Sequence, residues 1–123
     1  GGVDDPRILR SEESYQHLQN SVEKAVGDST SDAFTLLMSH RSQALDYAVP
    51  LGGVDLILAG HTHGFQCGIA GRSALEPFFP ERYIWGHYAK EQTQLYTTAG
   101  VGHWLPFRFG CPPEAPLFTL HRS

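Results

Sequence analysis

Two histidines that lie two positions apart are the strongest candidates for chemistry in this sequence. They belong to the segment GHTHG at residues 60–64. Glycine adopts backbone dihedrals that other residues avoid, so a turn flanked by Gly60 and Gly64 can bring both imidazoles into one small region. Neutral imidazole is the commonest side-chain metal ligand in proteins. The segment therefore indicates a metal site that includes His61 and His63.

A third histidine, His40, follows another short apolar run. Residues 33–39 and 54–59 both have the length and apolar character of buried strands, and each is followed by histidine. In α/β sheets, ligands sit at the carboxyl ends of the strands. An isolated pair of histidines would more often be an ordinary polar turn. The preceding strand, the flanking glycines and the third histidine together favour a metal site formed by His40, His61 and His63.

The elements that must position these histidines alternate between helix and strand. Ser11 is a suitable N-cap for an amphipathic helix, and the Asp5-Pro6 pair is typical of a turn. Helices are predicted at 11–26 and 43–49, and strands at 33–39, 54–59, 65–69, 83–88, 95–98 and 117–120. This order predicts an α/β, or layered α+β, fold in which residues 1–123 form one domain or part of one.

Composition narrows the function classes. The net charge is −4 and the nine lysines and arginines are scattered, so no nucleic-acid partner is predicted. No apolar run reaches the roughly 18 residues of a membrane-spanning helix. The two cysteines, Cys67 and Cys111, are too far apart in sequence for a paired metal-ligand motif, which leaves two ordinary thiols or a single disulfide. The sequence begins with neither methionine nor a signal peptide, and we expect it to be a piece of a longer protein.

Several segments together resemble one enzyme family. GHTHGFQ at 60–66 resembles the G-H-x-H-G-x-Q motif of calcineurin-like metallophosphoesterases, and FTLLMSH at 34–40 resembles the strand that presents the family's mid-domain histidine ligand. Further segments resemble the membrane-associated bacterial phosphodiesterase branch of that family: residues 2–5, 86–88, 95–102, 105–108 and 113–114.

The resemblance implies the C-terminal half of a four-layer β-sandwich flanked by helices, with a binuclear site. His40 and His61 would bind one divalent ion and His63 the other, and Mn, Fe, Zn and Mg are all compatible. Gln66 would orient His63 or hold a backbone turn, although an ordinary surface glutamine fits the sequence equally. His103 would lie near the mouth of the site, as a substrate contact or as a packing or surface residue.

The implied function is metal-dependent hydrolysis of phosphomonoester or phosphodiester bonds by a metal-bridging hydroxide. The family's D-x-H, G-D and G-N-H segments do not occur in these 123 residues, so no catalytic residue is assigned here. We therefore expect the chain to be inactive alone, and to pair with the N-terminal half of the same protein or to self-associate.

Two other hypotheses stay open. The chain could be a non-catalytic metal-binding or structural fragment, or a scaffold whose site has decayed. The aromatic second half fits a strand-rich core, and it also fits an apolar lip for a lipid-like group or a membrane surface. The branch resemblance favours a membrane-associated, extracytoplasmic location.

Overall fold

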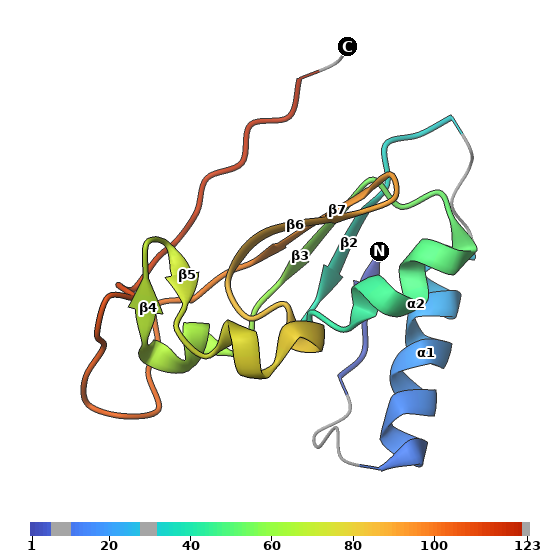
Figure 1. Ribbon diagram of the computed structural model, residues 1–123. Helices are drawn as coiled ribbons and strands as arrows, with labels where there is room; N and C mark the ends of the chain where they lie inside the picture. The colour runs from blue at the N-terminus through green and yellow to red at the C-terminus, as the bar shows by residue number, and fades with distance from the viewer. Residues whose placement is uncertain (6–10, 28–31, 122–123) are drawn as a thin grey trace.

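The computed structural model describes residues 1–5, 11–27 and 32–121. Its centre is a five-stranded sheet with the strand order β1-β2-β3-β7-β6 (Figure 1). These strands are β1 (Gly2–Val3), β2 (Leu36–Ser39), β3 (Leu56–Ala59), β6 (Gly86–Lys90) and β7 (Thr93–Thr97). The first four strands in that order are parallel, and β6 is antiparallel to β7. The predicted α/β class is confirmed.

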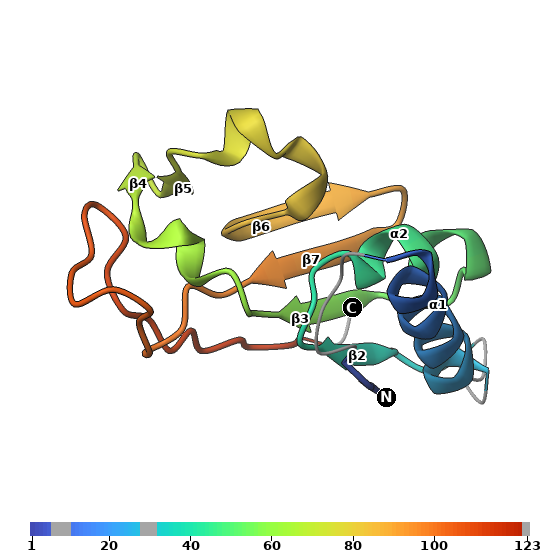
Figure 2. The same cartoon turned by 90° about the horizontal axis from the view of Figure 1, so that it is seen from below.

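Two helices pack beside the sheet, α1 (Glu12–Val26) and α2 (Ala44–Leu51) (Figure 2). The helix α1 begins after Ser11, whose Oγ accepts a hydrogen bond from the Ser14 backbone N–H at 3.3 Å. This is the N-cap that the sequence predicted. The helix α2 continues one residue past Pro50, where the sequence predicted its end, and closes at Gly52.

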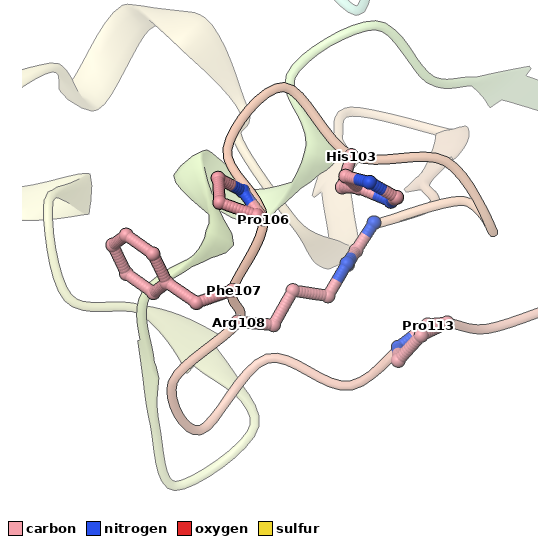
Figure 3. Close-up of a pocket in the computed structure, with 5 residues that line it drawn as sticks. All are labelled: His103, Pro106, Phe107, Arg108 and Pro113. Atoms are coloured by element: carbon pink, nitrogen blue, oxygen red, sulfur yellow. The ribbon is translucent and has the colours of Figure 1, made fainter.

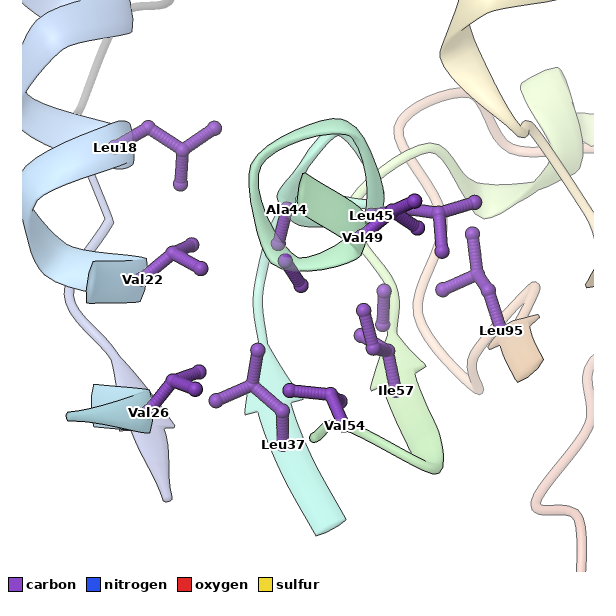
Figure 4. Close-up of a cluster of buried hydrophobic side chains, with 12 residues drawn as sticks. Leu18, Val22, Val26, Leu37, Ala44, Leu45, Val49, Val54, Ile57 and Leu95 are labelled. Carbon is purple, nitrogen blue, oxygen red and sulfur yellow. The ribbon is translucent and has the colours of Figure 1, made fainter. Parts of the chain in front are cut away.

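The core fills the space between the two helices and one face of the sheet. Leu37, Ile57 and Leu95 pair in register across β2, β3 and β7, and all three are fully buried. Figure 4 shows Leu37 and Ile57 next to the side chains that point inward from the helices, such as Val22 and Leu45. Burying each large aliphatic side chain contributes about 1.5–3 kcal/mol, so this layer fixes the alignment of the three strands.

The opposite face of the sheet also carries apolar side chains. Met38, Leu58 and Tyr96 lie opposite one another in register on β2, β3 and β7. Phe118 of the C-terminal segment contacts Tyr96 edge to face, with 5.1 Å between ring centroids, whereas Met38 is 61% exposed. An apolar sheet face with this exposure suits contact with further polypeptide.

One predicted strand is shorter than expected, and another is wrong. Residues 65–69 contain the end of a short 3-10 segment, η1 (His63–Gln66), followed by β4 (Gly68–Ile69), which pairs with β5 (Arg72–Ser73). Residues 117–120 form no strand, and Leu117 is 93% exposed. An apolar run forms a strand only where a neighbouring strand accepts its hydrogen bonds, and no strand in the described part of the chain pairs with these residues.

The remaining short elements are the 3-10 segments η2 (Glu76–Phe78) and η3 (Pro80–Arg82), which connect β5 to β6. The predicted strand at 83–88 begins later than expected, because β6 starts at Gly86. Across the described ranges, no helix is long and apolar enough to cross a membrane.

Candidate metal centre

Two of the three predicted ligands meet at the carboxyl edge of the sheet. His40 directly follows β2, and His61 lies two residues after β3, which is the parallel neighbour of β2. The backbone N–H of Gly60 donates to the carbonyl of His40 at 3.3 Å, which ties the two turns together. The parallel pairing of the strands therefore places the two imidazoles side by side.

The two imidazoles are in direct contact. Nε2 of His40 lies 2.8 Å from Nδ1 of His61, and Nη1 of Arg41 lies 2.9 Å from Nε2 of His61. A guanidinium can only donate, so Nε2 of His61 accepts, and Nδ1 carries the proton that it donates to His40. Burial and the adjacent Arg41 guanidinium lower the pKa of His61 to about 4. His61 is therefore neutral near pH 7, as a metal ligand must be.

An aspartate that the sequence analysis had assigned to a turn also reaches this site. Asp5 follows β1, the parallel neighbour of β2, and its Oδ1 accepts from Nε of Arg41 at 2.8 Å. Its Oδ2 lies 3.7 Å from Nε2 of His40. The sequence offered one signal for Asp5, namely its position just after a short segment that could itself be a parallel strand.

The turn that carries His61 and His63 has an unusual backbone. His61, His63, Phe65 and Gln66 all have positive φ, with values of 75°, 51°, 53° and 56°, and Gly64 has φ 63°. A non-glycine residue held in this region costs on the order of 1 kcal/mol or more. Such strain persists only where the surrounding structure fixes it, and it is concentrated in functional sites. The positive φ values therefore mark this turn as a candidate functional site.

His63 is held by a different part of the chain. Its Nδ1 lies 3.0 Å from the carbonyl oxygen of Gly102 and 3.4 Å from Nη2 of Arg108. The Trp104 ring packs against it with 5.0 Å between centroids, and the same ring lies 6.3 Å from that of His61. The segment 102–108 thus covers the histidine turn.

The two remaining predicted residues lie in and beside this segment. Gln66 is 2% exposed and bonds to the backbone of the segment, so it is not a surface residue. His103 is exposed and borders a cavity of about 240 Å³ (Figure 3). The other lining residues are Pro106, Phe107, Arg108 and Pro113.

These histidines are suitable ligands for a metal ion, but too few ligand side chains come together to hold one. Neutral imidazoles suit Zn and Fe, and two ligands on one tetrahedral zinc, with bonds of about 2.0–2.1 Å, would lie about 3.3 Å apart. The 2.8 Å between Nε2 of His40 and Nδ1 of His61 is a hydrogen-bond distance and is shorter than that separation. In residues 1–5, 11–27 and 32–121, however, no group of three or more His, Cys, Asp or Glu side chains is arranged to hold a metal ion. A complete centre would need further ligands.

Known proteins share this sequence over most of its length. The chain is 41% identical over 69 residues to phosphodiesterase YaeI of Escherichia coli, covering 54% of this chain and 25% of that protein. It is 34% identical over 93 residues to metallophosphoesterase YkuE of Bacillus subtilis, covering 71% and 31%. A zebrafish (Danio rerio) transmembrane protein with a metallophosphoesterase domain is 31% identical over 128 residues, covering 99% and 28%.

The chain thus spans about a quarter to a third of the length of these relatives. No family model matches the chain. No solved structure matches it either. The alignment with the zebrafish relative nevertheless covers 99% of this chain, and so it includes the strand ends that carry the histidines. The chain belongs to the calcineurin-like metallophosphoesterase family.

Proposed function

We propose that this chain is part of a metal-dependent phosphoesterase that hydrolyses phosphomonoester or phosphodiester bonds. The observation that carries the proposal is the contact between His40 and His61, 2.8 Å apart at the ends of adjacent parallel strands. Relatives that are named metallophosphoesterases or phosphodiesterases support the reaction class.

In this proposal, His40, His61 and His63 are metal ligands, and further ligands come from outside this chain. The metals are two divalent ions from the group Mn, Fe, Zn and Mg. Two such ions, when bound, lower the pKa of a water molecule and neutralise charge on the phosphoryl oxygens. The low pKa of His61 keeps its imidazole neutral and able to bind.

Arg41 and Asp5 would orient the ligand histidines. The Arg41 side chain is buried and contacts both Asp5 and His61. A carboxylate commonly orients a ligand histidine, as Asp5 would for His40, whereas Arg41 would hold the His61 ring until a metal displaces it from Nε2. The Arg41 cation also raises the electrostatic potential where an anionic phosphoester would approach.

The cavity beside His103 would receive the organic part of the substrate. Pro106, Phe107 and Pro113 give it apolar walls, and Figure 3 shows the Arg108 side chain extending toward the His103 ring. If His103 contacts the substrate, His103→Ala should raise KM several-fold with little change in kcat. An unchanged KM would leave His103 as a surface residue.

The exposed sheet face would pack against the rest of the protein. The row formed by Met38, Leu58 and Tyr96 is the surface that an N-terminal portion of the same protein would cover. Native mass spectrometry of the isolated chain should show self-association, and a mixture with that portion should give a 1:1 complex. A stable, monodisperse monomer of the chain alone would contradict this proposal.

We also propose a membrane-associated, extracytoplasmic location. The zebrafish relative is named as a transmembrane protein, which supports membrane proximity. Fractionation of cells that express the complete reading frame should place the protein with membranes, and added protease should cleave it in intact cells. Recovery in the soluble fraction, protected from protease, would contradict the location.

The decisive experiment measures bound metal and hydrolysis on the same protein. The product of the complete reading frame should bind divalent metal and hydrolyse bis-p-nitrophenyl phosphate, and a chelator should remove both properties. His63→Ala should lose both, while His17→Ala, which changes an exposed histidine on α1, should keep both. A protein that binds metal yet hydrolyses no mono- or diester in a test panel would support the non-catalytic alternative.

A further inference from the structure

The side chain of Gln66, at the end of the histidine turn, binds the backbone of the segment 102–108. Its Nε2 donates to the carbonyls of Leu105 and Phe107 at 2.9 and 2.6 Å. Its Oε1 accepts from the backbone N–H groups of Trp104 and Leu105 at 2.7 and 3.0 Å. A carboxamide has two donor hydrogens and two acceptor sites, so every one of them is used. Gln66 thus forms hydrogen bonds with backbone groups that lie 38 to 41 residues farther along the sequence.

A second side chain, Arg108, secures the two ends of the same segment. Its Nη2 donates to the carbonyls of Ala99 and Gly100 at 2.9 and 3.2 Å, and also to that of Gly102. Its Nη1 donates to the carbonyls of Cys111 and Pro112, each at 3.3 Å. A planar guanidinium presents these donors in a fixed fork that lysine lacks.

The group that these two side chains hold in place is the Gly102 carbonyl. It lies 3.0 Å from Nδ1 of His63, whereas Nη2 of Arg108 is farther from that nitrogen, at 3.4 Å, and donates to the same carbonyl. The carbonyl is therefore the hydrogen-bond partner of Nδ1, and a carbonyl oxygen can only accept. Nδ1 of His63 therefore carries the proton, which leaves the lone pair on Nε2. The approach is close, since a Cβ at Gly102 would lie 3.2 Å from Cε1 of the His63 ring.

We propose that Gln66 and Arg108 are positioning residues, which hold the 102–108 segment so that its Gly102 carbonyl selects the His63 tautomer with a free Nε2. Trp104, held by the same hydrogen bonds, covers the ring. The use of Nε2 as a metal ligand rests on the proposed function, whereas the tautomer itself does not. Hydrogen bonds from the second ring nitrogen commonly fix the tautomer of a ligand histidine.

The test reads the tautomer directly in metal-free protein. Two-bond ¹H–¹⁵N correlation spectra at about pH 8, well above the ordinary histidine pKa, show which ring nitrogen is protonated. The His63 signals are assigned by their absence in His63→Ala. Native His63 should be protonated mainly on Nδ1, and Gln66→Met and Arg108→Lys should each shift it mainly to Nε2. Acrylamide should also quench Trp104 fluorescence more strongly in both variants.

Matched controls change the same residue types elsewhere. Gln16→Met removes an exposed glutamine of α1 that makes one side-chain hydrogen bond, and Arg72→Lys alters a guanidinium that donates to the carbonyls of Trp85 and His87. Both should leave the His63 tautomer unchanged. Arg108→Lys adds a milder test should Gln66→Met unfold, because Arg108 is only partly buried.

The proposal is overturned if native His63 is protonated on Nε2. It is also overturned if His63 stays protonated on Nδ1 in a folded Arg108→Lys or Gln66→Met protein, because the two residues would then be structural only. Neither result depends on hydrolysis. A protein with the expected tautomer shifts but no phosphoesterase activity would refute the proposed function and leave the positioning role intact.

Discussion

Nδ1 of His61 lies 2.8 Å from Nε2 of His40, although 21 residues separate the two histidines in sequence. The contact depends on the parallel pairing of β2 with β3. Because Arg41 donates to the other nitrogen of the His61 ring, a single proton lies between the two imidazoles. The lone pair of neutral His61 is therefore on Nε2, and a metal that binds there would have to displace the Arg41 guanidinium.

The half-buried position of His61 beside Arg41 predicts how stability depends on pH. The folded pKa of about 4 lies below the ordinary value of 6.5, so the unfolded chain binds the proton first. In the metal-free chain, the contribution of His61 to the free energy of unfolding should be complete above about pH 6.5. It should be lost as the pH drops toward 4. We expect this contribution to be about 1–2 kcal/mol after allowing for solvent screening.

Urea denaturation of the native chain and of His61→Gln at several pH values between 7.5 and 4 measures this contribution. The difference between the two proteins should shrink as the pH falls. Parallel stability profiles would show that His61 titrates normally in the folded chain.

Asp5 and its neighbour Asp4 should respond differently to the same substitution. Asp5→Asn removes a charged partner of Arg41 beside His40, so we expect metal affinity of the complete protein to fall about 10- to 100-fold. Asp4 forms its ion pair with His17 on α1, and its side chain is 80% exposed. Asp4→Asn should leave the affinity unchanged. Isothermal titration with Mn²⁺ or Zn²⁺ would decide, and equal losses in both variants would exclude a specific role for Asp5.

The two glycines around the histidine pair should differ in their tolerance of alanine. Gly64 has φ 63°, and a Cβ there would lie 2.4 Å from Sγ of Cys111. Gly64→Ala should therefore cost about 2–4 kcal/mol through overpacking and backbone strain. At Gly60, φ is not in the left-handed region, and a Cβ would meet Cγ2 of Thr98 at an ordinary 3.6 Å. Gly60→Ala should change the free energy of unfolding by less than about 1 kcal/mol. Equal effects in chemical denaturation would contradict this assignment.

Adjacent residues of β2 report on the two faces of the sheet. Leu37 is fully buried against the helices, so Leu37→Ala should destabilise the chain by about 2–5 kcal/mol. Met38 is 61% exposed on the other face, and Met38→Ala should cost less than about 1 kcal/mol in the same measurement. If the proposed association uses that face, Met38→Ala should weaken association instead. A large loss of stability in the monomer would mean that Met38 is buried.

The sequence by itself determined the local features of this protein. The Ser11 cap and the apolar spacing of Leu18 and Val22 specify α1, because helix periodicity and capping depend on neighbours within one or two turns. The apolar runs before His40 and His61 specify strands for the same reason, and their shared direction places both histidines at one edge. The metal-ligand roles stay predictions, because the described residues include no complete ligand set.

Only the tertiary structure decided which distant residues surround these histidines. Asp5 joins His40 through the pairing of β1 with β2, and Gln66 enters the interior to bind the backbone of residues 104–107. The apolar run at 117–120 looked like a strand but has no strand to pair with. These features depend on contacts between segments that lie up to about 40 residues apart in sequence. Local propensity carries no information about those encounters, because they are set by packing and hydrogen bonding in the folded protein.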